Sequence, residues 1–431
     1  MPFELIPKNE LSLSLYEEDI GDIGEGNYYI EGVHGKFKFD RDSLSKHFLF
    51  IGAPGTGKTN AIFQFIDVIK NKIMTDEDVM IIFDTKGDYK SRFYDRNRGD
   101  VIISNFSSTV YWNLFEEISY DPEERWYLNA YEVSREIFYD NYVRAKDPYF
   151  PMAAADVTAA TMLALLRILK KNGVKPTNWH LFKNLVNGSP EELVITLKQF
   201  DDLQGALFHI ANLQSAQTQG VIGEIRQVLT PILSGDFGKE GDFSIRSFIN
   251  ERSRRTLFIE YDTAYGQLLT PIYRVMIDMA LKEGLSSHRP KKGSIFIVID
   301  EFALLPHLFH IEDGINFGRE QGIKLLVGIQ NVSQIIDEYG EYKAYSILAS
   351  FGTVFAFRVN DEASKRVVAA RYGDRIKPIE MRSRIPHEPD SMQFLNAPVI
   401  EPLTLGLLET GQCLICMAGR IPRKFKFKPV K

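Results

Sequence analysis

Residues 48–59, FLFIGAPGTGKT, limit what this chain can fold into more than any other stretch of the sequence. The apolar run at 48–51 predicts a short buried strand. Residues 52–59 fit the pattern G-x-x-x-x-G-K-[ST], and the periodic run at 60–70 predicts a helix. A strand, this loop and a helix in succession are the setting that a phosphate-binding loop requires.

The residue types of this loop suit the binding of ATP. Glycine lets the backbone curl, so that successive amide groups point at phosphate oxygens, and the start of the helix adds partial positive charge. Lys58 would reach the β- and γ-phosphates, and the Thr59 hydroxyl would bind Mg²⁺. A glycine turn followed by Lys-Thr by chance is the alternative, and the flanking strand and helix argue against it. The residues expected to contact the nucleotide are Gly52, Ala53, Pro54, Gly55, Thr56, Gly57, Lys58, Thr59 and Asn60.

Length, charge and cysteine content narrow the class of protein. A chain of 431 residues predicts two or three structural units. The net charge of −6 excludes a basic field over the whole surface, so DNA contacts would come from a local patch. Two cysteines, Cys413 and Cys416, cannot form a disulfide framework. Their surroundings, GQCLICMAG, predict a strand rather than a metal or redox pair.

The sequence predicts no membrane segment. Charged residues such as Glu4 and Lys8 interrupt the apolar start, so we expect no signal peptide. No apolar run approaches the ~18 residues that a membrane helix needs. The best candidate, residues 152–166, contains Asp156 and is better interpreted as a core helix. We therefore expect a soluble, cytoplasmic protein that partners could hold at the inner membrane.

The pattern of apolar residues divides the chain into three parts. Residues 1–118 carry a polar hairpin followed by short buried strands, and residues 241–431 return to that pattern. Residues 119–240 have long helical periodicity and predict an inserted all-α domain between two parts of an α/β domain. The expected strands include 79–84, 101–105, 256–260, 294–301, 323–329 and 353–359, and the expected helices include 123–138, 151–171, 191–200, 220–233 and 270–283.

An acidic pair at the end of a strand completes the predicted site. Asp300 follows the apolar run IFIVI, where it is suited to hold Mg²⁺ through water. Glu301 would polarise the attacking water. Gln330 ends the 323–329 strand and would sense or position the γ-phosphate, or would simply cap that strand.

Two further sites stay open between a functional and a structural interpretation. Arg319 is expected in the last turn of a helix stopped by Gly322, either as an arginine finger for a neighbouring subunit or as a partner of the helix dipole. The C-terminal cluster at 420–431 alternates lysine and phenylalanine, which favours an edge strand guarded by lysines over a nucleic-acid tail. The tetrapeptide at 85–88, TKGD, lies at a strand end where ligands bind, and an ordinary glycine turn is its alternative.

The chain resembles the cytoplasmic part of type IV coupling proteins, the TraD/TrwB group of conjugative DNA-transfer ATPases in the FtsK/HerA superfamily of RecA-like motors. The resemblance covers most of residues 40–425, more loosely in the helical insert. The motifs that carry it are HFLFIGAPGTGKT, FDTKGD, Trp112-Asn113, IDEFALLPHL, GREQGIKLLVGIQNVSQI, Tyr339-Gly340 and LLETGQCLICMAGRIP.

The resemblance implies a RecA-like P-loop NTPase domain with a mostly parallel central sheet and an inserted all-α domain. It carries nucleotide and Mg²⁺ binding to Lys58 and Thr59, Mg²⁺ and water to Asp300 and Glu301, phosphate sensing to Gln330 and the finger to Arg319. It also implies a hexameric ring that moves DNA independently of sequence, with a relaxase, accessory proteins or secretion-channel components as partners. Members usually begin with membrane helices, so we expect a soluble relative, one whose membrane part is a separate chain, or a shortened form. A HerA-type ATPase in defence or DNA processing and a non-motor recruitment platform are the alternatives.

Overall fold

The computed structural model describes residues 3–4, 21–286, 293–383 and 391–430. Their contacts divide the chain into two compact units. The first unit holds Met1–Ile73, Ile299–Ala303 and Lys324–Lys431, and the second holds Met74–Val298 and Leu304–Ile323. The predicted glycine-rich loop and the acidic pair therefore belong to the first unit, although the sequence separates them widely.

The first unit is built on strands that surround β5 (Phe48–Ile51). β5 pairs in parallel with β10 (Ile323–Ile329) on one side and with β11 (Thr353–Ala356) on the other. All four of its residues are buried, as expected for a strand covered on both faces. The segments that follow these three strands consequently meet at the carboxyl ends of the strands. β14 (Gln412–Met417) and β15 (Arg423–Lys426) extend the sheet antiparallel beyond β11.

A cluster of phenylalanines forms the core of this unit. The predicted hairpin is confirmed as β3 (Tyr28–Glu31) and β4 (Lys36–Phe39), and it places Phe37 and Phe39 against the α/β core. The Phe37 ring centroid lies 5.3 Å from that of Phe355, which in turn stacks on Phe50 at 4.7 Å. The hairpin is therefore part of the hydrophobic core of this unit.

The C-terminal cluster forms an edge strand, as the lysine–phenylalanine alternation predicts. Phe425 and Phe427 are buried, while Lys426 pairs with Glu409 at 2.7 Å and Lys428 with Glu31 at 2.8 Å. Cys413 and Cys416 are both buried in β14, which confirms the strand interpretation of the C-x-x-C spacing. In the part of the chain that the structure describes, no group of three His, Cys, Asp or Glu side chains could hold a metal ion.

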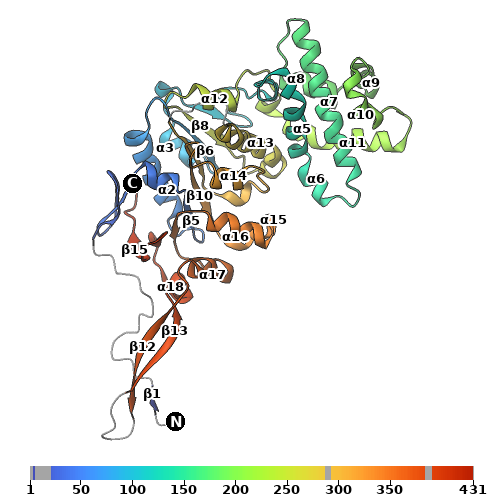
Figure 1. The fold of residues 1–431 in the computed structure, drawn as a ribbon. Helices are drawn as coiled ribbons and strands as arrows, with labels where there is room; N and C mark the ends of the chain where they lie inside the picture. The colour runs from blue at the N-terminus through green and yellow to red at the C-terminus, as the bar shows by residue number, and fades with distance from the viewer. Residues whose placement is uncertain (1–2, 5–20, 287–292, 384–390, 431) are drawn as a thin grey trace. The chain divides into compact units, whose positions relative to one another are not determined.

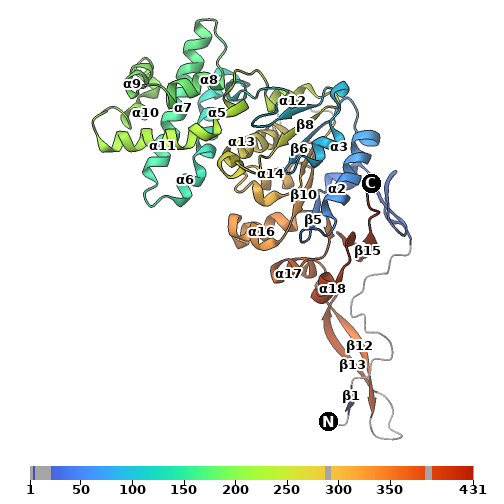
Figure 2. The same ribbon diagram turned by 180° about the vertical axis from the view of Figure 1, so that it is seen from behind.

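Helices and a long ribbon complete the first unit. The unit also contains the helices α15 (Val332–Tyr339), α16 (Glu341–Ala349), α17 (Glu362–Ala370) and α18 (Pro402–Leu407). Figures 1 and 2 show the antiparallel ribbon of β12 (Asp374–Ser383) and β13 (Ser391–Pro398) projecting from α17 and α18.

The second unit has its own strands, which lie in the order β9-β6-β8-β7. They are β9 (Ile295–Ile299), β6 (Val79–Asp84), β8 (Thr256–Glu260) and β7 (Val101–Ile103), and β8 pairs in parallel with both β6 and β7. Their near-continuous apolar sequences match the pattern of parallel strands buried on both faces. The predicted strands are confirmed, with β7 and β9 each ending two residues, and β11 three residues, earlier than expected.

Residues 119–240 contain helices and connecting segments, without a strand, as the helical periodicity predicts. α7 (Tyr149–Lys171) is the central helix, and Figures 1 and 2 show α5 (Trp126–Ile137) and α11 (Ala216–Ile232) beside it. By length and composition, α7 is the one helix among the described residues that could cross a membrane. It is longer than the apolar run that the sequence predicts there. Because 72% of its apolar window is buried within the fold, it serves as a core helix. The three-part division at residues 118 and 240 stays a prediction.

Two helices, α11 and α13, each begin four residues before the predicted start, since α11 begins at Ala216 and not at residue 220. α13 (Gly266–Leu285) begins before Thr270 and Pro271, which lie inside it rather than at its cap. The Thr270 hydroxyl donates to the Gly266 carbonyl at 3.0 Å, a bond from one turn of helix to the next. Gly266 suits the start because a Cβ there would lie 2.0 Å from the Tyr261 ring. The proline pattern misleads because this helix accommodates Pro271 after its first turn.

Candidate nucleotide-binding site

The glycine-rich loop at 52–57 is shaped for close approach of an anion. Gly55 and Gly57 have φ of +73° and +107°, in the left-handed region that favours glycine. A Cβ on Gly52 would lie 2.6 Å from Cβ of Phe357, so this position also has no room for a side chain. The loop is tied to its surroundings by the amide of Ala53, which donates to the Arg358 carbonyl at 2.8 Å.

The helix that follows the loop presents its first amides without a side-chain cap. α2 (Lys58–Val68) begins at Gly57, which supplies no capping hydrogen bond, and it continues as a π-helix through Ile69–Ile73, slightly beyond the predicted end. Lys58 is buried, and its Nζ donates to the Gly52 carbonyl at 2.5 Å. A helix N-terminus, curled glycines and an ammonium group at the loop together suit a chain of phosphates.

The Asn60 side chain has a partner that the sequence did not indicate. Its Nδ2 donates to the Lys428 carbonyl at 3.0 Å, and its Oδ1 accepts from the Val430 amide at 2.7 Å. The C-terminal segment is thereby fastened to the helix of the phosphate loop. No local pattern could reveal a contact between residues so distant in sequence. The nucleotide contact predicted for Asn60 stays a prediction.

The predicted Mg²⁺ ligands converge. The Thr59 hydroxyl donates to Oδ2 of Asp300 at 3.1 Å, and Asp300 is buried immediately after β9. Gly328 on β10 leaves room for the backbone of Asp300, since a Cβ there would lie 2.1 Å from the Asp300 carbonyl oxygen. A hydroxyl and a carboxylate beside a phosphate loop are hard oxygen ligands of the kind that Mg²⁺ takes. The residues present therefore fit the metal that the family implies.

The acidic pair also meets the polar end of β10. Nε2 of Gln330 donates to Oε2 of Glu301 at 2.5 Å. The sequence assigns Glu301 to the attacking water and Gln330 to the γ-phosphate, and the structure brings the two side chains into direct contact. The amide can therefore fix the orientation of the Glu301 carboxylate.

Arg319 does not lie in the last turn of a helix, where the sequence predicts it. It belongs to the second unit, and its side chain is exposed. α14 (Ile311–Asn316) ends before it, so the expectation of a last helical turn is wrong. Instead the chain turns through Gly318, whose carbonyl accepts from the Ile323 amide at 2.8 Å, and through Gly322 with φ of +83°. Two glycines within five residues favour a turn over the continuation of the helix.

The TKGD segment forms a glycine turn of the ordinary kind. Gly87 has φ of +74°, and Asp84 at the end of β6 accepts from the amides of Gly87 at 2.9 Å and Lys90 at 2.8 Å. Burial raises the pKa of Asp84 above its usual value, although these amides counteract the effect. The segment starts α3 (Asp88–Phe93) rather than reaching for a ligand by itself.

A family model described as the type IV secretion-system coupling protein DNA-binding domain matches residues 32–382. The chain belongs to this family. The match spans both units and includes the loop, the acidic pair, Arg319 and Gln330. The matched range includes residues 119–240.

Curated relatives in the coupling-protein family are distant. Over 358 residues the chain is 20% identical to coupling protein TraD of Escherichia coli strain K12, covering 79% of this chain and 46% of TraD. It is 25% identical over 197 residues to the conjugal transfer protein TraG of Rhizobium radiobacter, covering 44% of this chain and 30% of TraG. The chain thus spans less than half the length of either relative.

Solved structures support the fold assignment. The bacterial conjugative coupling protein TrwBdeltaN70 matches with a TM-score of 0.72 at 20% identity, covering 95% of this chain and 90% of that one. TrwB in complex with the ATP analogue ADPNP matches with a TM-score of 0.70 at 21% identity, covering 95% and 91% of the two chains. The predicted α/β fold, RecA-like with mostly parallel strands and an added helical part, is confirmed.

Proposed function

We propose that this chain binds ATP with Mg²⁺ and uses its hydrolysis to move DNA, as a motor of a conjugative transfer system. The observation that carries the proposal is the meeting of Thr59, Asp300 and the Glu301–Gln330 pair beside a glycine-rich loop. TrwB, which shares the fold, has been solved with an ATP analogue and with ADP and Mg²⁺.

Each residue has a distinct part in this proposal. The amides of the loop and the ammonium of Lys58 bind the phosphates, so Lys58 exchanges its bond with the Gly52 carbonyl for phosphate oxygens. Thr59 and Asp300 would hold Mg²⁺, which would supply positive charge to offset that of the phosphates. Glu301 takes a proton from the attacking water, and Gln330 keeps the Glu301 carboxylate oriented. Arg319 supplies a cation to the site of a neighbouring subunit.

Family membership supports the proposed partners. The family model is named for DNA binding, and TraD and TraG are named for coupling and conjugal transfer. We propose that the chain assembles into a hexameric ring, contacts DNA without regard to sequence, and works with a relaxase, accessory proteins or channel components. Its place would be the cytoplasm, at the inner face of the membrane.

The test is the rate of ATP hydrolysis by the purified chain without DNA, with single-stranded DNA and with double-stranded DNA. A motor is stimulated by DNA, and the stimulation falls as salt rises because phosphate contacts release counterions. Turnover that ignores both forms of DNA contradicts the motor and favours a recruitment platform. A HerA-type role in defence would share the stimulation, and loss of plasmid transfer in cells without the protein separates the two.

A further inference from the structure

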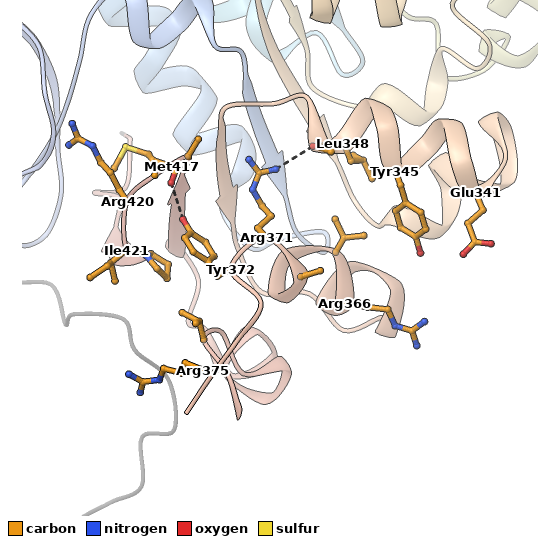
Figure 3. Close-up of a pocket in the computed structure, with 17 residues that line it drawn as sticks. Glu341, Tyr345, Leu348, Arg366, Arg371, Tyr372, Arg375, Met417, Arg420 and Ile421 are labelled. Atoms are coloured by element: carbon orange, nitrogen blue, oxygen red, sulfur yellow. Dashed lines mark hydrogen bonds between the residues drawn. The ribbon is translucent and has the colours of Figure 1, made fainter. Parts of the chain in front are cut away.

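A large open cavity lies in the first unit, away from the phosphate loop. Its volume is about 1190 Å³, and α16, α17 and the turn between β14 and β15 form its walls (Figure 3). Met417 in its wall pairs with Thr353, the first residue of β11. The phosphate loop instead follows the last residue of β5, which runs parallel to β11. The cavity and the phosphate loop therefore lie at opposite ends of these strands. The cavity consequently has no part in the chemistry proposed above.

The floor of the cavity is apolar. Leu348 from α16, Val367 from α17 and Met417 at the end of β14 contribute to it, and Ile421 stands 58% exposed at its margin. An apolar hollow of this size is uncommon on a surface that nothing covers. Its volume exceeds the roughly 300–1,000 Å³ of a usual small-molecule pocket.

The charged residues around this floor are mostly arginines. Among the described residues that line the cavity, Arg366, Arg371, Arg375 and Arg420 stand against one carboxylate, that of Glu341. The chain as a whole has a net charge of −6, so this concentration of positive charge runs against the general composition. The cavity therefore favours an anionic occupant.

The arginine side chains that line the cavity lie apart from one another and have different partners. Arg371 donates to the carbonyls of Leu348 at 3.4 Å and Phe351 at 2.6 Å, which fixes α17 to the end of α16. Arg420 pairs with the exposed Glu25 at 2.7 Å, an interaction that a stronger anion could replace. Nε of Arg375 is buried, with no hydrogen-bond partner among the described residues. Figure 3 shows the side chains of Arg366 and Arg420 on opposite sides of Arg371 and Tyr372.

This arrangement does not suit a single phosphate group. A phosphate site gathers its donors around one point and commonly uses a helix N-terminus or a glycine-rich loop. Here the guanidinium groups are distributed around an apolar floor, which is the anatomy of a protein interface with a charged rim and a hydrophobic centre.

We propose that this cavity docks an acidic, amphipathic peptide segment of a partner protein. Apolar side chains of the segment fill the space over Leu348, Val367 and Met417, and its carboxylates pair with Arg366, Arg375 and Arg420. The proposal goes beyond the motor function and does not depend on it, because docking requires neither ATP nor DNA.

The test begins with peptides selected for binding to the intact chain. Random peptides of roughly 12 residues, long enough for about three helical turns, are displayed on phage and selected on the immobilised protein. Affinities of the enriched sequences are then measured by fluorescence polarisation with labelled synthetic peptides. We expect sequences that combine leucine-like and acidic side chains, and a charge-reversed copy of each, with lysine for its acidic residues, should not bind.

Two variants connect binding to the cavity. Arg366→Glu reverses an exposed charge on the rim, and Ala418→Glu places a carboxylate on the exposed turn between β14 and β15. Each should weaken the selected peptides about tenfold or more, the effect of losing an interface hot spot. Lys198→Glu, an exposed charge reversal in the second unit, should leave affinity unchanged. ATP turnover and the melting temperature should match those of the unchanged protein in all three.

Three outcomes would overturn the proposal. The first is a selection that enriches no acidic peptides, and the second is affinity that survives both cavity substitutions. The third is displacement of the peptides by free nucleotide, or binding of the chain to anionic vesicles that is lost in Arg366→Glu, since either would assign the cavity to a phosphate-bearing ligand. Failure of ATP hydrolysis with intact peptide binding would instead contradict only the motor function.

Discussion

Lys58 makes the sharpest single-residue prediction, because its ammonium group at the start of α2 lies against the phosphate loop and not in the hydrophobic core. Lys58→Ala removes the ammonium that lies against the Gly52 carbonyl and leaves the apolar side of α2 intact. ATP turnover should fall at least ~10²-fold, the cost of losing one donor to developing charge, while circular dichroism shows an unchanged fold. Lys72→Ala, an exposed lysine of the same unit, serves as the control. Near-normal phosphate release by Lys58→Ala would remove this loop from the mechanism.

Glu301→Gln separates binding from hydrolysis. The substitution keeps the shape of the side chain and an oxygen that can accept from Gln330, but removes the base. Nucleotide affinity should be retained, while turnover drops by ~10²–10⁴, the usual worth of a general base. Glu320→Gln, an exposed change in the second unit, should have no effect on either quantity. A collapse in affinity measured with a fluorescent ATP analogue would instead make Glu301 a metal ligand or a structural residue.

At the scale of residues, features that depend on neighbouring residues could be predicted from the sequence, whereas contacts between distant residues could not. The strand, loop and helix at 48–70 and the position of Asp300 after an apolar strand could be recognised because each depends on neighbouring residues. The fastening of Asn60 to Lys428 and Val430 could not, since it requires the folded chain. The Trp112-Asn113 pair, noticed by resemblance alone, is structural in the fold. Trp112 is buried and donates to Glu117 at 2.8 Å, and Nδ2 of Asn113 donates to the carbonyls of Pro176 and Gly241.

At the scale of elements, the second unit buries a charged network where α5 packs on α13. Arg274 on α13 is fully buried, donates to the Glu136 carbonyl at 2.6 Å and pairs with Asp140 at 2.9 Å. Burial raises the pKa of the Glu136 carboxyl well above its usual value, and the nearby Asp278 adds to the effect, while Arg274 opposes it. His310 lies against Asp278 and Glu132, which raise its pKa despite the opposing effects of burial and Lys282. No pattern in the sequence indicated this network, because its members come from three separate segments.

This network predicts a pH dependence of stability. A carboxyl with a raised pKa in the folded state stays protonated after the unfolded chain has released its proton, so stability falls as pH rises above about 4.5. Glu136→Gln abolishes that titration. The free energy of unfolding of the unchanged protein, relative to Glu136→Gln, should therefore decrease from pH 5 upward, by at most about 1.4 kcal/mol per pH unit. Urea denaturation at several pH values measures it, and Glu224→Gln provides a control on the part-buried side of α11. Parallel pH profiles for the unchanged protein and Glu136→Gln would contradict the prediction.

At the scale of the whole molecule, the strands, their mostly parallel arrangement and the helical segment could be predicted, whereas the order of the strands in the sheet could not. The parallel strands and the helical character of 119–240 were predicted because apolar runs and helical repeats are read directly from residue spacing. The helical segment belongs to the same compact unit as β6, β7 and β8, a grouping that depends on packing and could not be deduced from the sequence. It could not be deduced from the sequence either that Arg319 and the phosphate loop belong to different units.

The assignment of Arg319 and the phosphate loop to different units matters for how an assembly would complete the proposed site. The first unit supplies the loop, Thr59, Asp300, Glu301 and Gln330, whereas Arg319 is exposed on the second unit. If Arg319 acts as a finger for a neighbouring subunit, Arg319→Ala should keep nucleotide binding and lose ~10³–10⁵ in turnover. Arg144→Ala, another exposed arginine of the second unit, should remain active.

Mixing two inactive variants tests the sharing directly. Lys58→Ala subunits retain Arg319, and Arg319→Ala subunits retain Lys58, so a mixed ring contains some sites with both groups. ATP turnover should therefore reappear when the two proteins are combined, in proportion to the number of neighbouring pairs in which an intact loop faces an intact Arg319. If the arginine acted within its own subunit, every site in the mixture would lack one group or the other. A mixture as inactive as its components, in assemblies shown by labelled subunits to exchange, would refute the shared site and leave Arg319 as a surface residue of the turn after α14.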